Sequence, residues 1–248
     1  APFTLKEIKE KKNYLIGNIK LILILGITSI TVFNSIVYYS LNFTQVISGV
    51  LMISTIPVMI IFFCWLLKIE KTNIYQILGV IFSLLGVVVI ITKANLYILL
   101  NLNFNKGDLW MVLAMFSWAL YSALLRKKKL EISQLSLLQV IISAGLVFLL
   151  PAYMIELSLG YKADINLPFI LTLSYVVLFP GLASFILWIK GISIIGSNRS
   201  GIFLHLIPIF STMMAIIIFK ERFMIYHLIG ATLIITGIIL SSKKRNNG

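Results

Sequence analysis

The chain has 248 residues, of which 60% are apolar and only 12% charged, and its mean hydropathy is +1.03. A soluble domain usually carries charge on about a quarter of its residues, so the composition excludes a soluble globular protein and indicates an integral membrane protein. The net charge of +13 does not indicate nucleic-acid binding, because the cations are scattered over short connections between apolar runs and form no single basic patch. The one cysteine, Cys64, leaves no internal disulfide possible.

Eight apolar runs approach the roughly 20 residues that a membrane-spanning helix needs. In chain order they are residues 19–40, 46–67, 74–92, 108–125, 134–155, 168–189, 200–219 and 224–242. The connections between them are short and polar and leave no room for a soluble domain. The predicted fold class is therefore an all-α integral membrane protein with eight transmembrane helices.

The lysines and arginines predict the orientation of these helices. Sixteen fall on the side of the N-terminus, including the runs 126–129 and 243–245, and five fall on the other side, at Lys93, Lys106, Lys162, Lys220 and Arg222. Cytoplasmic connections are enriched in positive charge, so this bias places both chain ends in the cytoplasm. The richness in Ile, Lys and Asn favours a bacterial source, and hence the bacterial inner membrane.

The chain repeats itself at an offset of 151 residues. The matching pairs are Pro57 and Pro208, Glu70 and Glu221, Tyr75 and Tyr226, Gly79 and Gly230, and Gly86 and Gly237. The two copies lie five spans apart, and an odd number of spans reverses the direction, so the repeats are inverted. Inverted repeats are a recurrent construction of secondary transporters.

The repeat predicts the domain organisation. Residues 1–95 form an incomplete N-terminal repeat of three helices, 96–107 a linker, and 108–248 a C-terminal repeat of five helices. The imbalance of three against five leads us to expect two further spans before Ala1.

Several motifs resemble one family of carriers. They are SG, IP, E and YQILG in this order within residues 48–79, the segment GSNRSGIFLHLIPIFSTMMAIIIFKERFMIYHLIG from residue 196, and WALYSALLRK from residue 118. Together they resemble the EamA-type carriers of the drug/metabolite transporter superfamily over essentially the whole chain. The resemblance implies a ten-helix fold of five plus five spans, with both ends cytoplasmic and a transport function.

The glycines and prolines of the repeat predict helix packing and helix shape. Gly79 and Gly86, like Gly230 and Gly237, are seven residues apart and therefore share one helix face. Small residues on one face let helices approach closely in lipid, so we assign these four to packing. Pro57 and Pro208 are expected to bend their helices and free a carbonyl, as hinges or as residues that shape a cavity.

The residue His205 is the only titratable group deep inside a run, and ionisable groups at this depth are frequently functional. We expect it to line the transport pathway, where it could bind substrate or couple transport to protons. The alternative is a neutral imidazole that is hydrogen-bonded to a neighbouring helix.

Other polar or aromatic residues within the runs complete the predicted pathway. They are Asn34, Tyr38, Ser54, Trp118, Tyr121, Ser122 and Trp188. A cavity lined by aromatic rings, amides and hydroxyls would suit small amphipathic solutes such as amino-acid-like compounds. Individually, each could instead hydrogen-bond between helices or belong to an interfacial aromatic belt.

Charged and capping groups near the connections have local interpretations. In GSNRSG, Ser197 or Asn198 is expected to cap a helix, with an anion-attracting helix start as the alternative. Glu70 and Glu221 each lie beside Lys or Arg in sequence and are expected to form local ion pairs.

Catalytic motifs are missing from the sequence, which has no HExxH, P-loop or GxSxG pattern. We therefore predict no catalytic residues, metal or cofactor, and a protein that is not an enzyme. The predicted function is a secondary transporter of small metabolites that works by alternating access, with a small-molecule substrate and the lipid bilayer as its partners. The alternatives are a membrane scaffold or accessory subunit and, third, an intramembrane lipid-modifying enzyme.

Overall fold

The computed structural model describes residues 4–103, 105–128, 130–161 and 163–243, and all regular secondary structure within them is helical. Four cations of the predicted charge bias, Lys129, Lys162, Lys244 and Arg245, lie outside the described residues.

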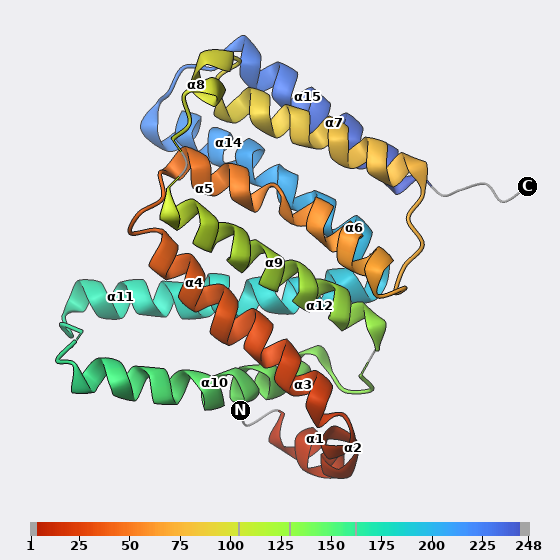
Figure 1. Cartoon of the computed structure of the whole chain (residues 1–248), viewed down its shortest axis with the longest axis vertical. Coiled ribbons are helices and arrows are strands. Elements are labelled where there is room, and N and C mark those ends of the chain that lie inside the picture. The colour runs from red at the N-terminus through yellow and green to blue at the C-terminus, as the bar shows by residue number, and fades with distance from the viewer. Residues whose placement is uncertain (1–3, 104, 129, 162, 244–248) are drawn as a thin grey trace, which may run out of the picture.

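Eight helical segments within the described residues are long and apolar enough to cross a membrane, which confirms the predicted number of spans. They are Ile19–Ser40, Ile47–Leu66, Ile74–Ile91, Lys106–Lys127, Gln134–Ser158, Leu167–Ile195, Ser197–Phe219 and Ile225–Ser242. They lie roughly side by side and run in alternating directions (Figure 1). Because their number is even, both ends of the described chain lie on the same side.

Four of these spans are single regular helices, namely α7 (Ile74–Ile91), α9 (Lys106–Lys127), α10 (Gln134–Ser158) and α15 (Ile225–Ser242). Their starts follow from the sequence, because α7, α9 and α10 begin after Asn73, Asn105 and Ser133, whose side chains accept hydrogen bonds from the first turn. Three short helices lie outside the spans: α1 (Leu5–Glu10), α2 (Lys12–Gly17) and α8 (Leu96–Leu100). The segment expected to be a linker, 96–107, thus holds α8 and the start of α9.

The other four spans are interrupted, and the interruptions recur in the two repeats. The first span consists of α3 (Ile19–Gly26), the π-helix η1 (Ile27–Val32) and α4 (Phe33–Ser40), and the sixth of α11 (Leu167–Val176), the π-helix η2 (Val177–Ala183) and α12 (Ser184–Ile195). The second consists of α5 (Val46–Ile53) and α6 (Ile56–Leu66), and the seventh of α13 (Ser197–Ile202), the 3₁₀-helix η3 (Phe203–Leu206) and α14 (Ile207–Phe219). Val32 and Ala183 end the two π-helices at the offset of 151 found in the sequence.

The two prolines of the repeat stand at the interruptions of their spans, and their expected role as hinges or cavity-shaping residues stays a prediction. Pro57 is the second residue of α6, and Pro208 is the second residue of α14. In the second span α5 ends two residues before α6 begins, and in the seventh span η3 leads directly into α14, so each proline stands in the first turn of its helix. The missing N–H of proline is tolerated there, because the first turn of a helix has no intrahelical acceptor for it.

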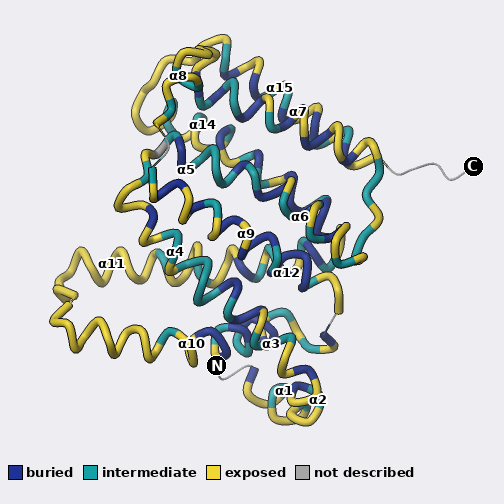
Figure 2. The backbone as a smooth tube through the Cα atoms, in the orientation of Figure 1, coloured by how far each residue is buried: buried dark blue, intermediate teal, exposed yellow. Residues whose placement is uncertain are grey.

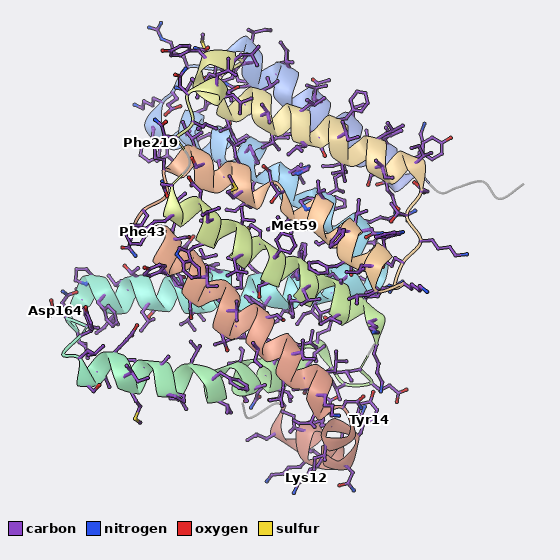
Figure 3. The ribbon with its side chains drawn as sticks, viewed as in Figure 1. Lys12, Tyr14, Phe43, Met59, Asp164 and Phe219 are labelled. Atoms are coloured by element: carbon purple, nitrogen blue, oxygen red, sulfur yellow. The ribbon has the colours of Figure 1, made fainter. Side chains whose placement is uncertain are left out.

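Connections at the two ends of the bundle lie on opposite sides of the molecule. Phe43, Asp164 and Phe219 lie toward one end of the helices, Lys12 and Tyr14 toward the other, and Met59 lies between them (Figure 3). We call the end with Asp164 the outer end and the end with Lys12 the inner end, following the charge bias. The second half of α10 and most of α11 project from the bundle with exposed surfaces, as Figure 2 shows.

The closest helix pair joins the last spans of the two repeats, α7 and α15. A Cβ atom added to Gly79 would lie 2.5 Å from the carbonyl oxygen of Gly237, and one added to Gly86 would lie 2.5 Å from that of Gly230. The repeat relates these two contacts to each other, because Gly79 corresponds to Gly230 and Gly86 to Gly237. All four predicted packing glycines therefore lie at one crossing of the inverted repeats.

A substitution at this crossing tests its packing. Gly86→Ala should lower the free energy of unfolding by about 1–3 kcal/mol, because the new methyl group meets a backbone oxygen that cannot move aside. Gly17→Ala is the matched control, since a Cβ atom there has nothing within 4 Å. Thermal unfolding of the purified variants in detergent measures both, and equal stabilities would contradict the assigned contact.

Candidate transport pathway

A cluster of aromatic rings lies where α4, α9 and α12 meet. The ring centroid of Trp118 lies 4.5 Å from that of Phe33, 5.2 Å from those of Tyr121 and Phe185, and 5.7 Å from that of Trp188. Trp118 is 8% exposed and Tyr121 fully buried. Such rings close the space between helices and also offer faces on which an apolar or aromatic group can stack.

Hydroxyl groups run alongside this cluster. The indole Nε1 of Trp188 donates to Ser122 Oγ at 3.1 Å, and Ser122 Oγ donates to the Trp118 carbonyl at 2.8 Å. Ser197 Oγ donates to the Ser122 carbonyl at 2.7 Å and so ties α13 to α9. The structure thus brings four predicted pathway residues, Trp118, Tyr121, Ser122 and Trp188, into one cluster.

Three buried polar atoms near this cluster have no hydrogen-bond partner within the described part of the chain. They are Tyr121 OH, Asn198 Oδ1 and Ser200 Oγ. A buried polar group without a partner is costly, so such atoms identify places where water or a polar solute can bind.

Two cavities lie at opposite ends of α10. The inner cavity, of about 420 Å³, lies where α9 ends and α10 begins, and Leu25, Leu137 and Ile192 contribute to its walls. The outer cavity, of about 700 Å³, is lined by Tyr38 and Tyr39 of α4 and by Tyr153 and other residues of the second half of α10. The predicted pathway residue Tyr38 is therefore 58% exposed at the outer end, away from the Trp118 cluster.

A tight helix crossing separates the two cavities. A Cβ atom added to Gly26 would lie 2.7 Å from the backbone nitrogen of Gly145, and Thr31 Oγ1 donates to the Gly145 carbonyl at 2.9 Å. This crossing coincides with η1. The predicted residue Asn34 supports that π-helix, because its amide donates to the carbonyls of Ser29 and Ile30 at 2.9 and 3.2 Å.

The predicted residue His205 is fully buried at a different place, between the breaks of the second and seventh spans. Its Nε2 lies 2.8 Å from the Ser54 carbonyl oxygen, and its Nδ1 lies 2.6 Å from Ser83 Oγ. A carbonyl only accepts hydrogen bonds, so this network assigns the proton of the neutral ring to Nε2 and makes Nδ1 the acceptor of the Ser83 hydroxyl. The arrangement matches the alternative of a hydrogen-bonded imidazole, and a role in the pathway stays a prediction.

The hydrogen bond between His205 and Ser54 joins corresponding positions of the two repeats, because these residues are 151 apart. The carbonyl of Ser54 is available because α5 ends at Ile53 and α6 restarts at Ile56. The predicted pathway residue Ser54 is 4% exposed, and its own hydroxyl donates back to the Leu51 carbonyl at 2.7 Å. Ser54 and His205 thus connect the two helix breaks directly.

The inner end is held by two carboxylates from the first repeat. Glu70 accepts hydrogen bonds from the backbone nitrogens of Ser197 and Asn198, both at 3.0 Å, and pairs with Arg126 Nε at 3.0 Å. This corrects two predictions: Glu70 caps α13 in place of a side chain of Ser197 or Asn198, and its ion-pair partner comes from α9 and not from a sequence neighbour. The favourable position of a carboxylate at a helix start explains the arrangement.

The second carboxylate, Glu7 of α1, binds the start of α10. It accepts hydrogen bonds from the backbone nitrogen of Ser133 at 2.8 Å and from the hydroxyls of Ser133 and Ser136, both at 2.5 Å. The Ser133 hydroxyl, the Ser136 hydroxyl and the Ser133 amide lower the pKa of Glu7 from its usual 4.5 to about 2. Sequence reasoning missed this contact, since it joins residues 126 positions apart.

Metal-ligating side chains are dispersed over the described part of the chain. No group of three or more His, Cys, Asp or Glu side chains that could hold a metal ion lies among them. The chemistry available to the described site is stacking, hydrogen bonding and charge attraction.

Two inverted helical units joined at their helix breaks define a polytopic α-helical membrane protein of the transporter type. The sequence model of the EamA-like transporter family matches residues 1–92 and 105–243, and the chain belongs to this family.

Similar proteins carry names that agree with this membership. The chain is 25% identical over 232 residues to the uncharacterized transporter YyaM of Bacillus subtilis (strain 168). The matched region covers 94% of this chain and 76% of that protein. The chain is 26% identical to the uncharacterized transporter YetK of the same organism, over 90% of this chain and 68% of that protein. A solved crystal structure with 15% sequence identity has a TM-score of 0.71 over 91% of this chain and 77% of its own, and shows the same fold.

The contact of Glu7 predicts how stability depends on pH. Because the folded-state pKa is lowered, the contact stabilises the protein above pH 4.5, and this contribution is lost as the pH falls through about 2. Glu7→Gln should therefore unfold at a lower temperature at pH 7 and lose less stability than the parent between pH 4.5 and 2. Glu10→Gln, on the same helix, is the control and should behave like the parent in thermal unfolding at each pH. Parallel curves for the parent and Glu7→Gln would contradict the assigned contact.

Proposed function

We propose that this member of the EamA-like transporter family is a secondary transporter of small amphipathic solutes that works by alternating access, in a bacterial inner membrane with both chain ends cytoplasmic. The observation that carries the proposal is the pair of cavities at opposite ends of α10, with the Gly26–Gly145 crossing between them along this helix. Residues Leu137 and Leu150 of α10, one in each cavity, are about 20 Å apart along the helix at 1.5 Å per residue. A solute that passed the crossing would move across most of a bilayer core.

The solute class follows from groups at the outer cavity and from groups next to the crossing. Tyr38 and Tyr39 lie at the outer cavity, and the Trp118 cluster with its hydroxyls lies next to the crossing. Aromatic faces favour an apolar or ring-containing part, and the unpartnered Tyr121 hydroxyl favours a polar group. Amino-acid-like and other small amphipathic metabolites combine both parts.

The movement that alternates access would use the interrupted spans. The π-helices and the breaks lie in the first, second, sixth and seventh spans, whereas α7 and α15 are regular and closely packed through their glycines. Interruptions of this kind are frequent at functional sites and are common in the discontinuous helices of transporters. We assign α7 and α15 to a rigid frame and the interrupted spans to the moving parts. Pro57 and Pro208 mark where the second halves of the second and seventh spans begin.

The alternative functions have less support from the described residues. A lipid-modifying enzyme would need a group of reacting side chains at one membrane face, and a scaffold would not need cavities at both ends of α10. We therefore expect no enzymatic activity.

Reciprocal accessibility tests alternating access. In a Cys64→Ala background, Ser35→Cys lies at the outer cavity and Ser193→Cys at the inner cavity. In proteoliposomes, a solute from a panel of amino acids and aromatic acids that shows saturable uptake should change the maleimide labelling rates of the two cysteines in opposite directions. Asn13→Cys on the exposed side of α2 is the control and should not respond. Parallel changes at both cavity sites, or no saturable uptake of any solute, would contradict the proposal.

Variants of His205 separate its possible roles. We propose that His205 holds the two helix breaks together, so His205→Ala should lower the free energy of unfolding by about 1–3 kcal/mol, because it leaves the buried Ser54 carbonyl unpaired and removes one of the two hydrogen bonds of Ser83. His205→Gln should retain part of the stability, because its amide can still donate to the Ser54 carbonyl. In the double variant with Ser83→Ala, the losses should be less than additive. If both variants were as stable as the parent but failed to transport, His205 would instead be a substrate ligand or a proton-coupling residue.

A further inference from the structure

Among the described residues, the walls of the inner cavity carry two cationic side chains and no acidic one. Arg126 and Lys128, at the end of α9 and just beyond it, line the cavity, and its other polar wall residues are Ser133, Gln134 and Ser193. The remaining wall residues are apolar, among them Leu25 and Ile192, each 1% exposed. The cavity therefore has a deep apolar part and a cationic rim.

Both cations keep hydrogen-bond donors that the protein does not use. Arg126 uses Nε for Glu70 and directs Nη1 at the Ser193 carbonyl at 3.5 Å, whereas a guanidinium has five N–H groups. Lys128 donates to Asn18 Oδ1 at 2.5 Å and has two further N–H groups. An anion at the rim could accept hydrogen bonds from both residues without breaking either contact.

Carboxylates of the protein already bind next to this rim. Glu70 lies on Arg126, and Glu7 binds Ser133, which is itself a wall residue of the cavity. The third nearby acid is Glu131, which follows the cavity residue Leu130 in the chain. These three acids lie outside the cavity wall, so they compensate part of the charge of the rim and leave the wall itself cationic.

We propose that the inner cavity binds the anionic group of the transported solute, with Arg126 and Lys128 as its ligands and the apolar wall as the site of its body. The inference rests on the proposed transport function and narrows its substrate class to small organic anions with a short apolar part. A volume of about 420 Å³ suits such a solute. A phospholipid headgroup would offer the same anionic chemistry, but its two acyl chains exceed the enclosed space.

Three matched probes test the charge preference by isothermal titration calorimetry on the whole chain in detergent. They are butanesulfonate, a permanent anion, butanesulfonamide, which is neutral, and butyltrimethylammonium, a permanent cation. Butanesulfonate should bind, and the other two should bind at least about tenfold more weakly, as the loss of one charge-assisted hydrogen bond implies. Equal binding of all three, binding of none, or preference for the cation would overturn the proposal.

Variants locate the site. Lys128→Gln should weaken butanesulfonate binding about tenfold, and Lys128→Arg should restore it, because the charge at the rim returns. The neighbouring Lys127→Gln is the matched control, since Lys127 does not line the cavity, and Asn18→Ala removes the partner of Lys128 without changing the charge of the wall. Both controls should bind like the parent, and equal weakening by Lys127→Gln would overturn the site. Variants are compared only where size-exclusion chromatography and thermal unfolding match the parent; if Lys128→Gln fails this check, Lys128→Ala and Lys128→Met replace it.

Two further measurements separate this proposal from the transport function and from lipid binding. Exchange of labelled butanesulfonate across proteoliposomes should require Lys128, whereas binding without exchange would leave the anion site in place and contradict transport. Exchange of the neutral or cationic probe alone would support transport and overturn the anionic class. Displacement of bound butanesulfonate by dihexanoylphosphatidylglycerol at a much lower concentration would assign the rim to lipid headgroups and overturn the proposal as well.

Discussion

Every interruption of a membrane-spanning helix frees backbone groups at a depth where water cannot bind them, so the protein must supply their partners. The first and second spans do this with side chains from neighbouring positions and neighbouring helices. Asn34 and Ser117 bind carbonyls of the first span near η1, and His205 binds the carbonyl of Ser54 at the break of the second. Without these partners the freed carbonyls would be left unpaired among apolar groups, which is costly.

The inverted repeat explains where the interruptions fall, and the divergence of its copies explains their chemistry. Ser54 corresponds to His205, and Ser83, which binds His205, corresponds to the buried Ile234. Two corresponding positions that touch each other must lie near the axis that relates the repeats, where there is space for only one large side chain. One copy therefore provides the histidine, and the other provides a small serine and a free carbonyl.

Much of this fold could be predicted from the sequence, because hydropathy and residue spacing report on each helix separately. The eight spans and the shared faces of Gly79 and Gly86 are properties of this kind. The π-helices and the partners of Glu7, Glu70 and His205 are not, because they depend on which helices become neighbours. The repeat offset of 151 residues also pairs Ser54 with His205, so the sequence did contain a signal for this one contact.

The two ends of the described bundle are held by different forces. At the inner end Glu7 and Glu70 of the first repeat each bind the start of a helix of the second, and Glu70 adds the ion pair with Arg126. At the outer end the corresponding contacts are weaker, namely the hydrogen bond from Asn105 to the Phe43 carbonyl at 2.8 Å and Lys106 at 4.2 Å from the Phe43 ring centroid. Charge-assisted hydrogen bonds are roughly twice as strong as neutral ones. The polar contacts that join the repeats are therefore stronger at the inner end than at the outer end of the described bundle.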